Sequence, residues 1–536
     1  MKALNAAEMR EVDRLTTERF GVPSLKLMEA AGKHVAEAVL RAFVPDLPKK
    51  IAVLCGKGNN GGDGFVAARY LQKNVTRLCA YLFAAPEELR GDAAINFKRW
   101  QESGGQVTLI QEDAAWGAAW PEIANTDVIV DALLGTGLRG AATGQIAQAI
   151  TDLNGLSRNA AAPRPALILA VDTPSGLPSD GERADGPLLR VHKTLTFTAP
   201  KIGQLISPDA AAVGLLEVRG IGSPAALIEE VGKGTLRWAE PEEFAGLPLV
   251  RAADSHKGSF GHVLLVAGSV GKSGAAVLAG RAALIAGSGL VTVAVPDGVL
   301  PAVTAGQAEY MTAPLRSTNA GTAALRNLEG QYFTEIASGK TVLAVGPGVG
   351  TQAETQEFIR TIVLQTELPV VLDADGLNAF AGKADSMRER KTKFLCVTPH
   401  PGEMARLLGL SSAKIQADRV QAAVEAARRW NAHVVLKGFH TIVAGPNGAV
   451  FVNTTGNAGL AKGGSGDVLT GILAALTAQF GTDEWLRVLA LGVYLHGSAA
   501  EAATEKTDMS GLLAGEVAEA IPQARQRLVR ELQRRG

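Results

Sequence analysis

The chain has 536 residues, enough for two or more domains that each bury a full core. Apolar residues make up 47% and charged residues 20%, an ordinary balance for a globular protein, and Lys plus Arg equals Asp plus Glu at 53 each. This zero formal net charge gives no support to binding of nucleic acid or of a membrane surface. No run of about 18 apolar residues occurs, so we expect no membrane span.

The cysteines indicate a reducing compartment. Cys55, Cys79 and Cys396 are odd in number, form no Cys-x-x-Cys pair and lie in or beside predicted buried strands. This pattern argues against a disulfide framework or a zinc site. The segment 1–10 has no apolar core and does not resemble a signal peptide, so we expect a cytoplasmic protein.

The first half alternates helices with short apolar strands. Helical spacing covers 5–20 and 25–43, and the continuous apolar run 51–55 predicts a buried parallel strand. The glycine-rich segment 56–64 is expected to be a loop, followed by a helix over 65–72. Further strands are expected at 76–83, 127–131, 166–171 and 194–198.

The glycines after the first strand match a dinucleotide-binding fingerprint only in part. Gly56, Gly58 and Gly61 satisfy G-x-G-x-x-G between a strand and a helix. The next strand, however, ends without the acidic residue that would hold a ribose. A conventional hydride-transfer site is therefore weakly supported. The amide carbonyls and carboxylate of 59–63 could serve a cation or a ribose, and a plain polar turn is the alternative.

Three strands of the first half end in glycines plus an acidic or amide group. Asp131 ends one strand, Asp172 follows another, and the segment 56–64 follows the first. Because ligands bind at the carboxyl ends of parallel strands, we expect these groups to form one site. Either aspartate alone could instead be a strand-end cap. Lys201, after the strand at 194–198, could reach the same site or be solvated.

These motifs resemble the three signatures of the NAD(P)H-hydrate epimerase family, also called the YjeF N-terminal domain. The resemblance implies a Rossmann-like three-layer domain over 1–222 that epimerises hydrated NADH or NADPH at C6. The matching motifs, in order, are Asn59-Asn60-Gly61-Gly62-Asp63-Gly64, Asp131-Ala132-Leu133-Leu134-Gly135-Thr136-Gly137 and Asp172-Thr173-Pro174-Ser175-Gly176.

The resemblance also implies roles for individual residues. Asp172 would contact the substrate and is our candidate acid/base. Asn60, Asp131 and Ser175 would hold a potassium ion (K+), and their oxygen ligands suit a hard alkali cation. The residues expected to bind the hydrate are Asn59, Asn60, Gly61, Gly62, Asp63, Gly135, Thr136, Gly137, Leu138, Arg139, Gly140, Ala141 and Asp172.

The second half continues the α/β pattern in a domain expected over 235–536. We interpret 223–240 as the connection between the domains, and 274–286 as a helix. The segments 441–444 and 449–452 alternate around Pro446-Asn447-Gly448, which predicts a hairpin. Other strands are expected at 262–267, 290–295, 341–345, 368–372, 394–397 and 433–436.

A glycine loop ending in Asp467 precedes a helix expected at 468–480. Glycines allow close approach of the backbone to a ligand, and a helix N-terminus favours anions. Asp467 could take a proton from a substrate hydroxyl while the backbone amides hold a phosphoryl group in transfer. The alternative is an aspartate that caps the helix after a flexible loop.

Other strand ends supply the remaining parts of a phosphoryl-transfer site. Asp373 and Asp375 follow one strand, His400 another and Lys437 a third. Together they offer a lysine and acidic groups for magnesium. Each has an alternative interpretation: the aspartates as helix caps, His400 as a satisfied structural histidine, and Lys437 as a solvated strand end.

This order resembles the ribokinase-like fold, and closely the ADP/ATP-dependent NAD(P)H-hydrate dehydratase family, or YjeF C-terminal domain. The matching motifs are His256-Lys257-Gly258, Gly346-Pro347-Gly348, Asp373-Ala374-Asp375, His400-Pro401-Gly402-Glu403 and Gly464-Ser465-Gly466-Asp467. The resemblance implies ADP with Mg2+ as the phosphoryl donor. Implied contacts to the hydrate are Ala275, Gly348, His400 and Asp467, and implied contacts to the nucleotide are Lys437, Gly438, Phe439, His440, Thr441 and Gly466.

The two resemblances together predict a bifunctional repair enzyme of two α/β domains, expected to form a homo-oligomer. It would epimerise the R and S forms of hydrated NAD(P)H and dehydrate the S form to NAD(P)H, converting ADP to AMP and phosphate. One alternative is a ribokinase-like small-molecule kinase with a nucleotide-binding regulatory N-terminal domain. In another, the first half only binds a nucleotide or a protein partner.

Overall fold

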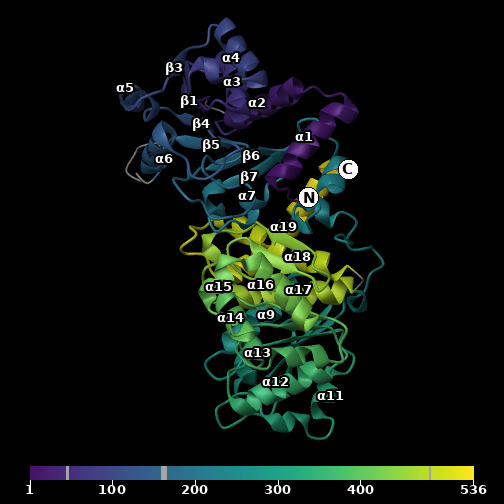
Figure 1. Ribbon diagram of the computed structural model, residues 1–536. Coiled ribbons are helices and arrows are strands. Elements are labelled where there is room, and N and C mark those ends of the chain that lie inside the picture. The colour runs from purple at the N-terminus through teal and green to yellow at the C-terminus, as the bar shows by residue number, and fades with distance from the viewer. Residues whose placement is uncertain (44–46, 158–165, 482–483, 536) are drawn as a thin grey trace. The chain divides into compact units, whose positions relative to one another are not determined.

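The computed structural model describes residues 1–43, 47–157, 166–481 and 484–535. The chain forms two compact units, one over Lys2–Gly234 and the other from Thr235 onward together with Met1. In each unit, helices lie on both sides of a β-sheet (Figure 1). The predicted fold class, two α/β domains in one chain, is therefore confirmed.

The first unit contains a parallel sheet whose described strands run in the order β3-β2-β1-β4-β5-β6-β7. The third strand in this order, β1, pairs with β2 on one side and β4 on the other, so the strand order reverses there. Parallel α/β sheets bind ligands outside the carboxyl ends of the strands at such a switch point. The strands are β1 (Lys50–Cys55), β2 (Arg77–Leu82), β3 (Val107–Leu109), β4 (Val128–Ala132), β5 (Leu167–Val171), β6 (Lys193–Phe197) and β7 (Leu215–Arg219).

Side chains that alternate along the strands pack against two separate layers of helices, one on each face of the sheet. Ile51 and Val53 share a core with α2, α3 and α4, whereas Ala52 and Leu54 share another with α5 and α6. These layers make the three-layer arrangement predicted for this half. The helices are α1 (Ala6–Phe20), α2 (Ser24–Arg41), α3 (Asn59–Leu71), α4 (Gly91–Glu102), α5 (Asp113–Ile123), α6 (Gly144–Ser157), α7 (Ile202–Ile206) and α8 (Ala225–Val231).

The glycine-rich segment after β1 is helical earlier than the sequence predicted. We expected a loop over 56–64, but α3 begins at Asn59. A Cβ on Gly61 would lie 1.9 Å from the carbonyl oxygen of Gly56, and one on Gly64 would lie 2.9 Å from Cys55 Sγ. The lack of side chains therefore lets the first turns of α3 pack directly against the end of β1.

The second unit contains a mixed sheet with the described strand order β11-β10-β9-β12-β13-β14-β15-β16-β17-β8. The predicted hairpin is confirmed, because β16 and β17 pair antiparallel. The predicted connection 223–240 contains the boundary between the two units, after Gly234, but it also contains α8 and the strand β8, which pairs with β17. The strands are β8 (Leu236–Trp238), β9 (His262–Val266), β10 (Leu290–Pro296), β11 (Met311–Leu315), β12 (Val342–Val345), β13 (Val370–Leu372), β14 (Leu395–Val397), β15 (His433–Leu436), β16 (Thr441–Ala444) and β17 (Val450–Asn453).

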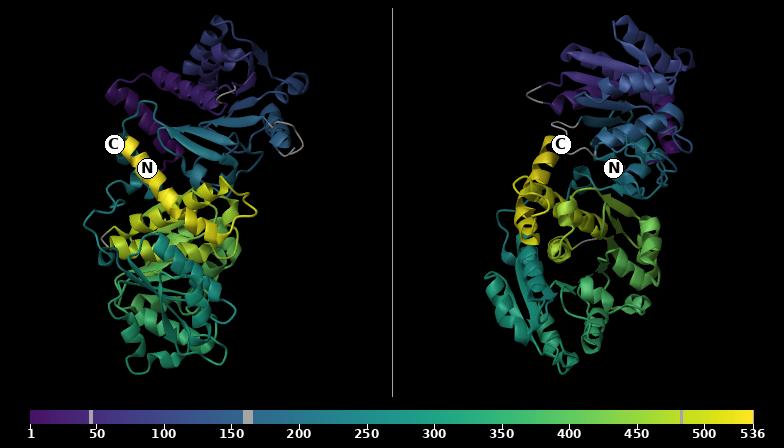
Figure 2. Two further views of the ribbon diagram at one scale, coloured as in Figure 1. Left: turned by 180° about the vertical axis from the view of Figure 1, so that it is seen from behind. Right: turned by 90° about the vertical axis from the view of Figure 1, so that its left-hand side faces the viewer.

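Helices also cover the second sheet on both faces, as two further views show (Figure 2). One face carries α9, α17, α18 and α19, which share a single hydrophobic core with the sheet. The helices of this unit are α9 (Ser273–Ile285), α10 (Leu300–Gly306), α11 (Tyr332–Ala337), α12 (Ala353–Gln365), α13 (Ala374–Asn378), α14 (Pro401–Leu408), α15 (Ser412–Ala417), α16 (Arg419–Trp430), α17 (Ser465–Phe480), α18 (Trp485–Thr504) and α19 (Ala514–Arg535).

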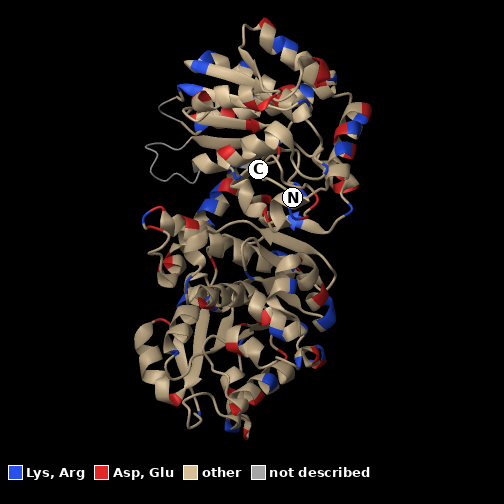
Figure 3. Cartoon of the chain, turned by 60° about the vertical axis from the view of Figure 1, so that its left-hand side comes forward, with Lys and Arg blue, Asp and Glu red and all other residues tan. Residues whose placement is uncertain are grey.

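The three cysteines are free and buried, as expected from their number and spacing. Lys and Arg residues are interspersed with Asp and Glu residues along the ribbon (Figure 3). Of the helices in the described ranges, none has the length and apolar character needed to cross a membrane.

Helix α17 crosses α9 closely because residue 471 is a glycine. A Cβ on Gly471 would lie 2.2 Å from the carbonyl oxygen of Ala279. Gly471→Ala is therefore expected to lower the free energy of unfolding by about 1–3 kcal/mol, measured by urea denaturation. Gly515→Ala, in α19, is the matched control, because a Cβ there meets nothing within 4 Å. Equal losses in the two variants would contradict this account of the helix crossing.

Candidate functional sites

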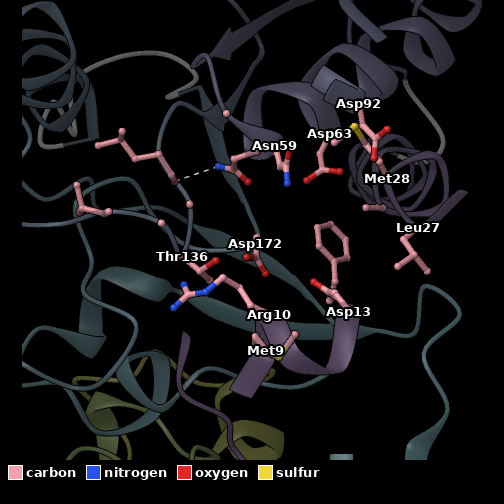
Figure 4. A pocket seen from close by; sticks show the side chains of 18 of the residues that line it. Met9, Arg10, Asp13, Leu27, Met28, Asn59, Asp63, Asp92, Thr136 and Asp172 are labelled. Atoms are coloured by element: carbon pink, nitrogen blue, oxygen red, sulfur yellow. Dashed lines mark hydrogen bonds between the residues drawn. The ribbon is translucent and has the colours of Figure 1, made fainter. Parts of the chain in front are cut away.

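A cavity of about 840 Å3 lies at the switch point of the first unit. This volume falls in the range of small-molecule sites. Figure 4 shows side chains from α1, α3 and the end of β5 that line it. Nine of the residues predicted to bind the hydrate line this cavity: Asn59, Asn60, Asp63, Gly135, Thr136, Gly137, Leu138, Arg139 and Asp172.

Four of the predicted hydrate contacts lie elsewhere. Gly61 and Gly62 are buried in the first turns of α3, and a Cβ on Gly62 would lie 2.7 Å from Met28 Sδ. Their role in the structure is to let α3 pack closely. Gly140 and Ala141 are exposed beyond the part of the loop that lines the cavity.

Asp172 occupies a strained position at the end of β5. Its φ of 62° is left-handed, which is uncommon for a residue with a side chain and is found preferentially at functional sites. Its carboxylate forms an ion pair with Lys201 and accepts a hydrogen bond from Thr196 Oγ1 at 2.9 Å. Lys201 is only 1% exposed, so the alternative of a solvated lysine is wrong.

The three predicted potassium ligands come together around the peptide of Leu134. Asn60 Nδ2 donates to Leu134 O at 3.0 Å, and Leu134 N donates to Ser175 Oγ at 2.9 Å. Ser175 Oγ donates in turn to Asp131 Oδ1 at 2.5 Å. Asp131 and Ser175 have no exposed surface, whereas Asn60 lines the cavity.

The donor set around Leu134 has the properties that an alkali cation requires. Asn60 Oδ1 is buried and has no hydrogen-bond partner within the described ranges. Burial raises the pKa of Asp131 to about 6, although hydrogen bonds from Ser175 and Leu133 oppose that rise. A bound cation would satisfy the orphaned oxygen and neutralise the buried carboxylate. The residues therefore fit K+.

The cavity also contains a carboxyl group that the sequence analysis missed. Asp13 of α1 faces the same space as Asp63 and Asp172 (Figure 4). Burial raises the pKa of Asp63 well above its usual value, and the charges of Asp172 and Asp13 add to the effect. The sequence around Asp13 shows only a helical pattern, which gives no signal of a ligand-facing side chain.

In the second unit, the N-terminus of α17 faces the ends of two strands. Gly464 is the N-cap residue, with φ of 91°, so the alternative that Asp467 caps the helix is wrong. A Cβ on Gly466 would lie 3.5 Å from Lys437 Nζ and 3.8 Å from Asp373 Oδ2. The strand ends after β13 and β15 thus meet the first turn of α17, whose amides have no partner within the helix.

A buried ion pair joins these strand ends. Lys437 Nζ donates to Asp373 Oδ1 at 2.6 Å, and Thr470 Oγ1 donates to Asp373 Oδ2 at 2.7 Å. Burial alone would raise the pKa of Asp373, but Lys437 holds it below its usual range. Asp373 is the N-cap residue of α13, as the alternative interpretation had it, but its side chain makes no cap hydrogen bond and instead orients Lys437. Lys437 is no solvated strand end.

Asp467 lies next to this pair and is poised to exchange a proton near neutral pH. Burial raises its pKa to about 7, and the charge of Asp373 adds to the effect while that of Lys437 opposes it. A general base works best when its pKa is close to the operating pH. The environment of Asp467 therefore suits a proton acceptor.

His400 caps a helix with one ring nitrogen, while about half of its side chain is exposed. As N-cap of α14, its Nδ1 accepts from Gly402 N at 3.0 Å, so the structural alternative is correct for one ring nitrogen. The side chain is nevertheless 52% exposed. Glu403, which accepts from His400 N at 2.8 Å and lies 3.8 Å from Lys437 Nζ, links His400 to the ion pair. Sequence analysis gave Glu403 no role, although it ends the His-Pro-Gly-Glu motif.

Ala275 and Gly348, the two small residues predicted to contact the hydrate, are adjacent. A Cβ on Gly348 would lie 3.0 Å from Ala275 Cβ. The neighbouring Lys272 forms an ion pair with Asp375 at 2.9 Å, and Asp375 also accepts from Gly350 N at 3.0 Å. The loops after β9, β12 and β13 are therefore held together at one edge of the sheet.

The predicted nucleotide-binding segment forms the turn between β15 and β16. Phe439 is 60% exposed and stacks on the ring of His440, with ring centroids 4.0 Å apart. Arg419 of α16 supports the turn from below, donating to the carbonyl oxygens of Leu436, Phe439 and His440. The sequence analysis gave Arg419 no role. Its partners are backbone carbonyl groups, which every residue has, so the sequence of the turn does not indicate this contact.

Removal of this support should weaken nucleotide binding. Arg419→Met is expected to raise the KM for ADP by about 10-fold, the equivalent of about 1.4 kcal/mol, with a smaller change in kcat, because the turn loses its preorganised shape. Steady-state kinetics with varied ADP measure the effect. Arg429→Met on the same helix, which removes only a partly exposed ion pair with Asp385, is the control and should leave KM unchanged. A KM for Arg419→Met within twofold of wild type would contradict the proposed support.

Comparisons with known proteins match both units. The YjeF-related protein N-terminus family matches residues 24–203, and the NAD(P)H-hydrate dehydratase family matches residues 263–523. The bifunctional NAD(P)H-hydrate repair enzyme Nnr of Moorella thermoacetica is 40% identical over 99% of this chain and 98% of its own length. The enzyme of the same name from Escherichia coli is 34% identical over 95% of this chain and 91% of its own length.

Among solved structures, the ADP/ATP-dependent NAD(P)H-hydrate dehydratase from Bacillus subtilis, co-crystallised with ATP/Mg2+, is 29% identical. The match covers 54% of this chain and 98% of that chain, with a TM-score of 0.47.

Proposed function

The chain belongs to the family of bifunctional NAD(P)H-hydrate repair enzymes, and we propose that its two units divide the repair between them. The unit over Lys2–Gly234 interconverts the R and S epimers of the hydrate, and the unit from Thr235 onward dehydrates the S epimer with ADP. The observation that carries the second assignment is the meeting of Asp467, Lys437 and Asp373 at the N-terminus of α17.

Dehydration begins by turning a poor leaving group into a good one. Asp467 accepts the proton of the C6 hydroxyl as the hydroxyl oxygen attacks the terminal phosphorus of ADP, and the bond to AMP breaks. The amides of the first turn of α17 stabilise the phosphoryl group in transfer. The electron pair of the ring nitrogen then expels phosphate from C6, and loss of a proton from C5 regenerates NAD(P)H.

The chain's own residues place the two substrates. Lys437, fixed by Asp373, reaches the phosphates, and Gly438, Phe439, His440 and Thr441 form the turn that receives the nucleotide. Ala275, Gly348 and His400 would contact the hydrate. These roles remain proposals that rest on the family's motifs and on the geometry above.

Magnesium bound with the nucleotide would neutralise the phosphate charge. Within the described ranges, no cluster of three or more His, Cys, Asp or Glu side chains is placed to hold a metal ion. Both oxygens of Asp373 are already hydrogen bonded. The phosphate oxygens of the nucleotide would therefore supply most of the ligands to the magnesium ion.

The epimerase proposal rests on the cavity at the end of β1, β4 and β5. Asp172, which forms an ion pair with Lys201, faces this cavity and is positioned to exchange protons with the C6 hydroxyl or with water. Asn60, Asp131 and Ser175 would hold K+, which would supply a fixed positive charge beside the substrate. The lining loop Gly135–Arg139 would contact the rest of the hydrate.

Product analysis with hydrated NADH tests the whole proposal. The full chain, given mixed epimers with ADP and Mg2+, is expected to convert both to NADH and to release AMP and phosphate. Without ADP it should only interconvert the epimers. A stable phosphorylated product without NADH would instead indicate a small-molecule kinase.

A further inference from the structure

Asp13 is a carboxyl group of the epimerase cavity that no motif assigns. It lies on α1, whereas the other carboxyl groups lie on α3, on α4 and after β5 (Figure 4). Its Oδ1 atom is buried and finds no hydrogen-bond partner among the residues that the structure describes. A buried hydrogen-bond acceptor without a donor is rare and destabilises the fold. We therefore expect this oxygen either to contact a ligand or to carry a proton.

The lysine nearest to this acid has no donor left for it. An ammonium group has three N–H donors. Those of Lys201 are directed to Asp172 Oδ1, to Thr196 Oγ1 at 2.7 Å and to Phe197 O at 3.2 Å. The two acids therefore differ: Asp172 is paired with a buried cation, whereas Asp13 forms no ion pair within the described ranges and can hold a proton.

We propose that Asp13 is a second catalytic carboxyl group of the epimerisation, acting as the acid while Asp172 acts as the base. The inference deepens the proposed epimerase function and rests on it. The two groups reach the cavity from different elements, α1 and the end of β5, so they can address the substrate from different directions. Inversion at one carbon requires such an arrangement.

The step balances with water as the only co-reactant. Asp13 gives its proton to the C6 hydroxyl, the C6–O bond breaks, and water leaves with the bonding pair. The electron pair of the ring nitrogen forms a C6=N bond. A second water then attacks the opposite face of C6, the electron pair returns to nitrogen, and Asp172 takes the proton of the attacking water. Proton exchange with solvent then removes the proton from Asp172 and returns one to Asp13. In the reverse epimerisation, Asp172 donates the proton to the leaving hydroxyl and Asp13 accepts the proton of the attacking water.

The charges around Asp13 favour the required protonation. Burial raises the pKa of Asp13 to about 6, with Asp172 adding to the rise and Lys201 opposing it. Because the acid must be protonated, epimerisation should fall as pH rises through about 6. The other charged side chains that line the cavity are Lys57, Asp63, Glu88, Asp92, Arg139, and Arg10 and Arg14 of α1 itself.

The test compares Asp13→Asn with Glu122→Gln, a control that removes a partly exposed carboxylate, which is paired with Arg77 and does not line the cavity. Separated epimers are incubated with the full chain, and their interconversion is followed by chromatography from pH 5 to 8. Asp13→Asn is expected to lose about 100-fold or more in rate and to lose the fall above pH 6, because amides cannot donate an acidic proton. Asp13→Glu should recover part of the rate together with that fall.

Dehydration of the pure S epimer, measured in the same samples, shows that the second unit of each variant is intact, and the recovery of epimerisation in Asp13→Glu shows that substitution at this position leaves the first unit folded. A wild-type rate in Asp13→Asn, or a reduced rate that keeps the fall above pH 6, overturns the assignment. If the wild-type chain does not interconvert epimers faster than buffer, the epimerase function itself fails. The two failures are distinguishable, because only the second affects the unmodified chain.

Discussion

Asp467→Asn is expected to lower ADP-dependent recovery of NADH by about 10²–10⁴-fold, the usual contribution of a positioned general base. The amide keeps the shape of the side chain but cannot accept the hydroxyl proton. The rate is measured from the absorbance of NADH with the S epimer, ADP and Mg2+. Epimerisation, which occurs in the other unit, should continue at the wild-type rate. Recovery of NADH at the wild-type rate would exclude Asp467 as the base.

The same substitution should not destabilise the protein. The pKa of Asp467 is raised to about 7 in the folded state, so the ionised carboxylate is disfavoured there relative to the unfolded chain. That group therefore costs stability increasingly as pH rises from its unfolded value toward about 7. Asp467→Asn is expected to melt at the same or a higher temperature at pH 8, which separates loss of chemistry from loss of fold.

The pH profile of dehydration follows from the same value. Because the base must be ionised, kcat/KM for the S epimer should rise with pH through about 7 and level off above it. A profile with no inflection between pH 6 and 8 would mean that Asp467 does not titrate in the free enzyme as described.

Asp172→Asn is expected to lower epimerisation by about 10²–10⁴-fold while dehydration of the S epimer continues. The carboxylate that faces the cavity is lost, and the buried ammonium of Lys201 loses its counter-charge. The rate is measured as interconversion of separated epimers by chromatography. Continued interconversion at the wild-type rate would instead support a first unit that only binds nucleotide.

Two comparisons make the result at Asp172 interpretable. Glu122→Gln removes a carboxylate near the opposite end of the strands, where it pairs with Arg77 at 2.9 Å, and should leave both activities unchanged. Breaking a buried ion pair can cost about 3–5 kcal/mol, so the melting temperature of Asp172→Asn must also be measured. Dehydration by the same sample reports whether the rest of the chain is intact.

Much of the architecture could be predicted from local patterns. The continuous apolar runs that became β1, β4 and β5 have no polar face, so they must be buried on both sides in a parallel sheet. The alternation around Asn447-Gly448 gave the β16–β17 hairpin. The start of α3 was misplaced because polar residues and glycines look like a loop, and only the close fit of Gly61 against Gly56 explains a helix there.

The sequence by itself determined which groups end the strands, since Asp131, Asp172, Asp373 and Lys437 directly follow or close apolar runs that can only be buried strands. Only the tertiary structure decided what those groups do, because burial, charge and hydrogen bonding depend on neighbours far along the chain. Asp172 is paired with Lys201, and 64 residues separate Lys437 from the Asp373 that fixes it. Asp13 enters the cavity solely through the packing of α1, which no local pattern could reveal.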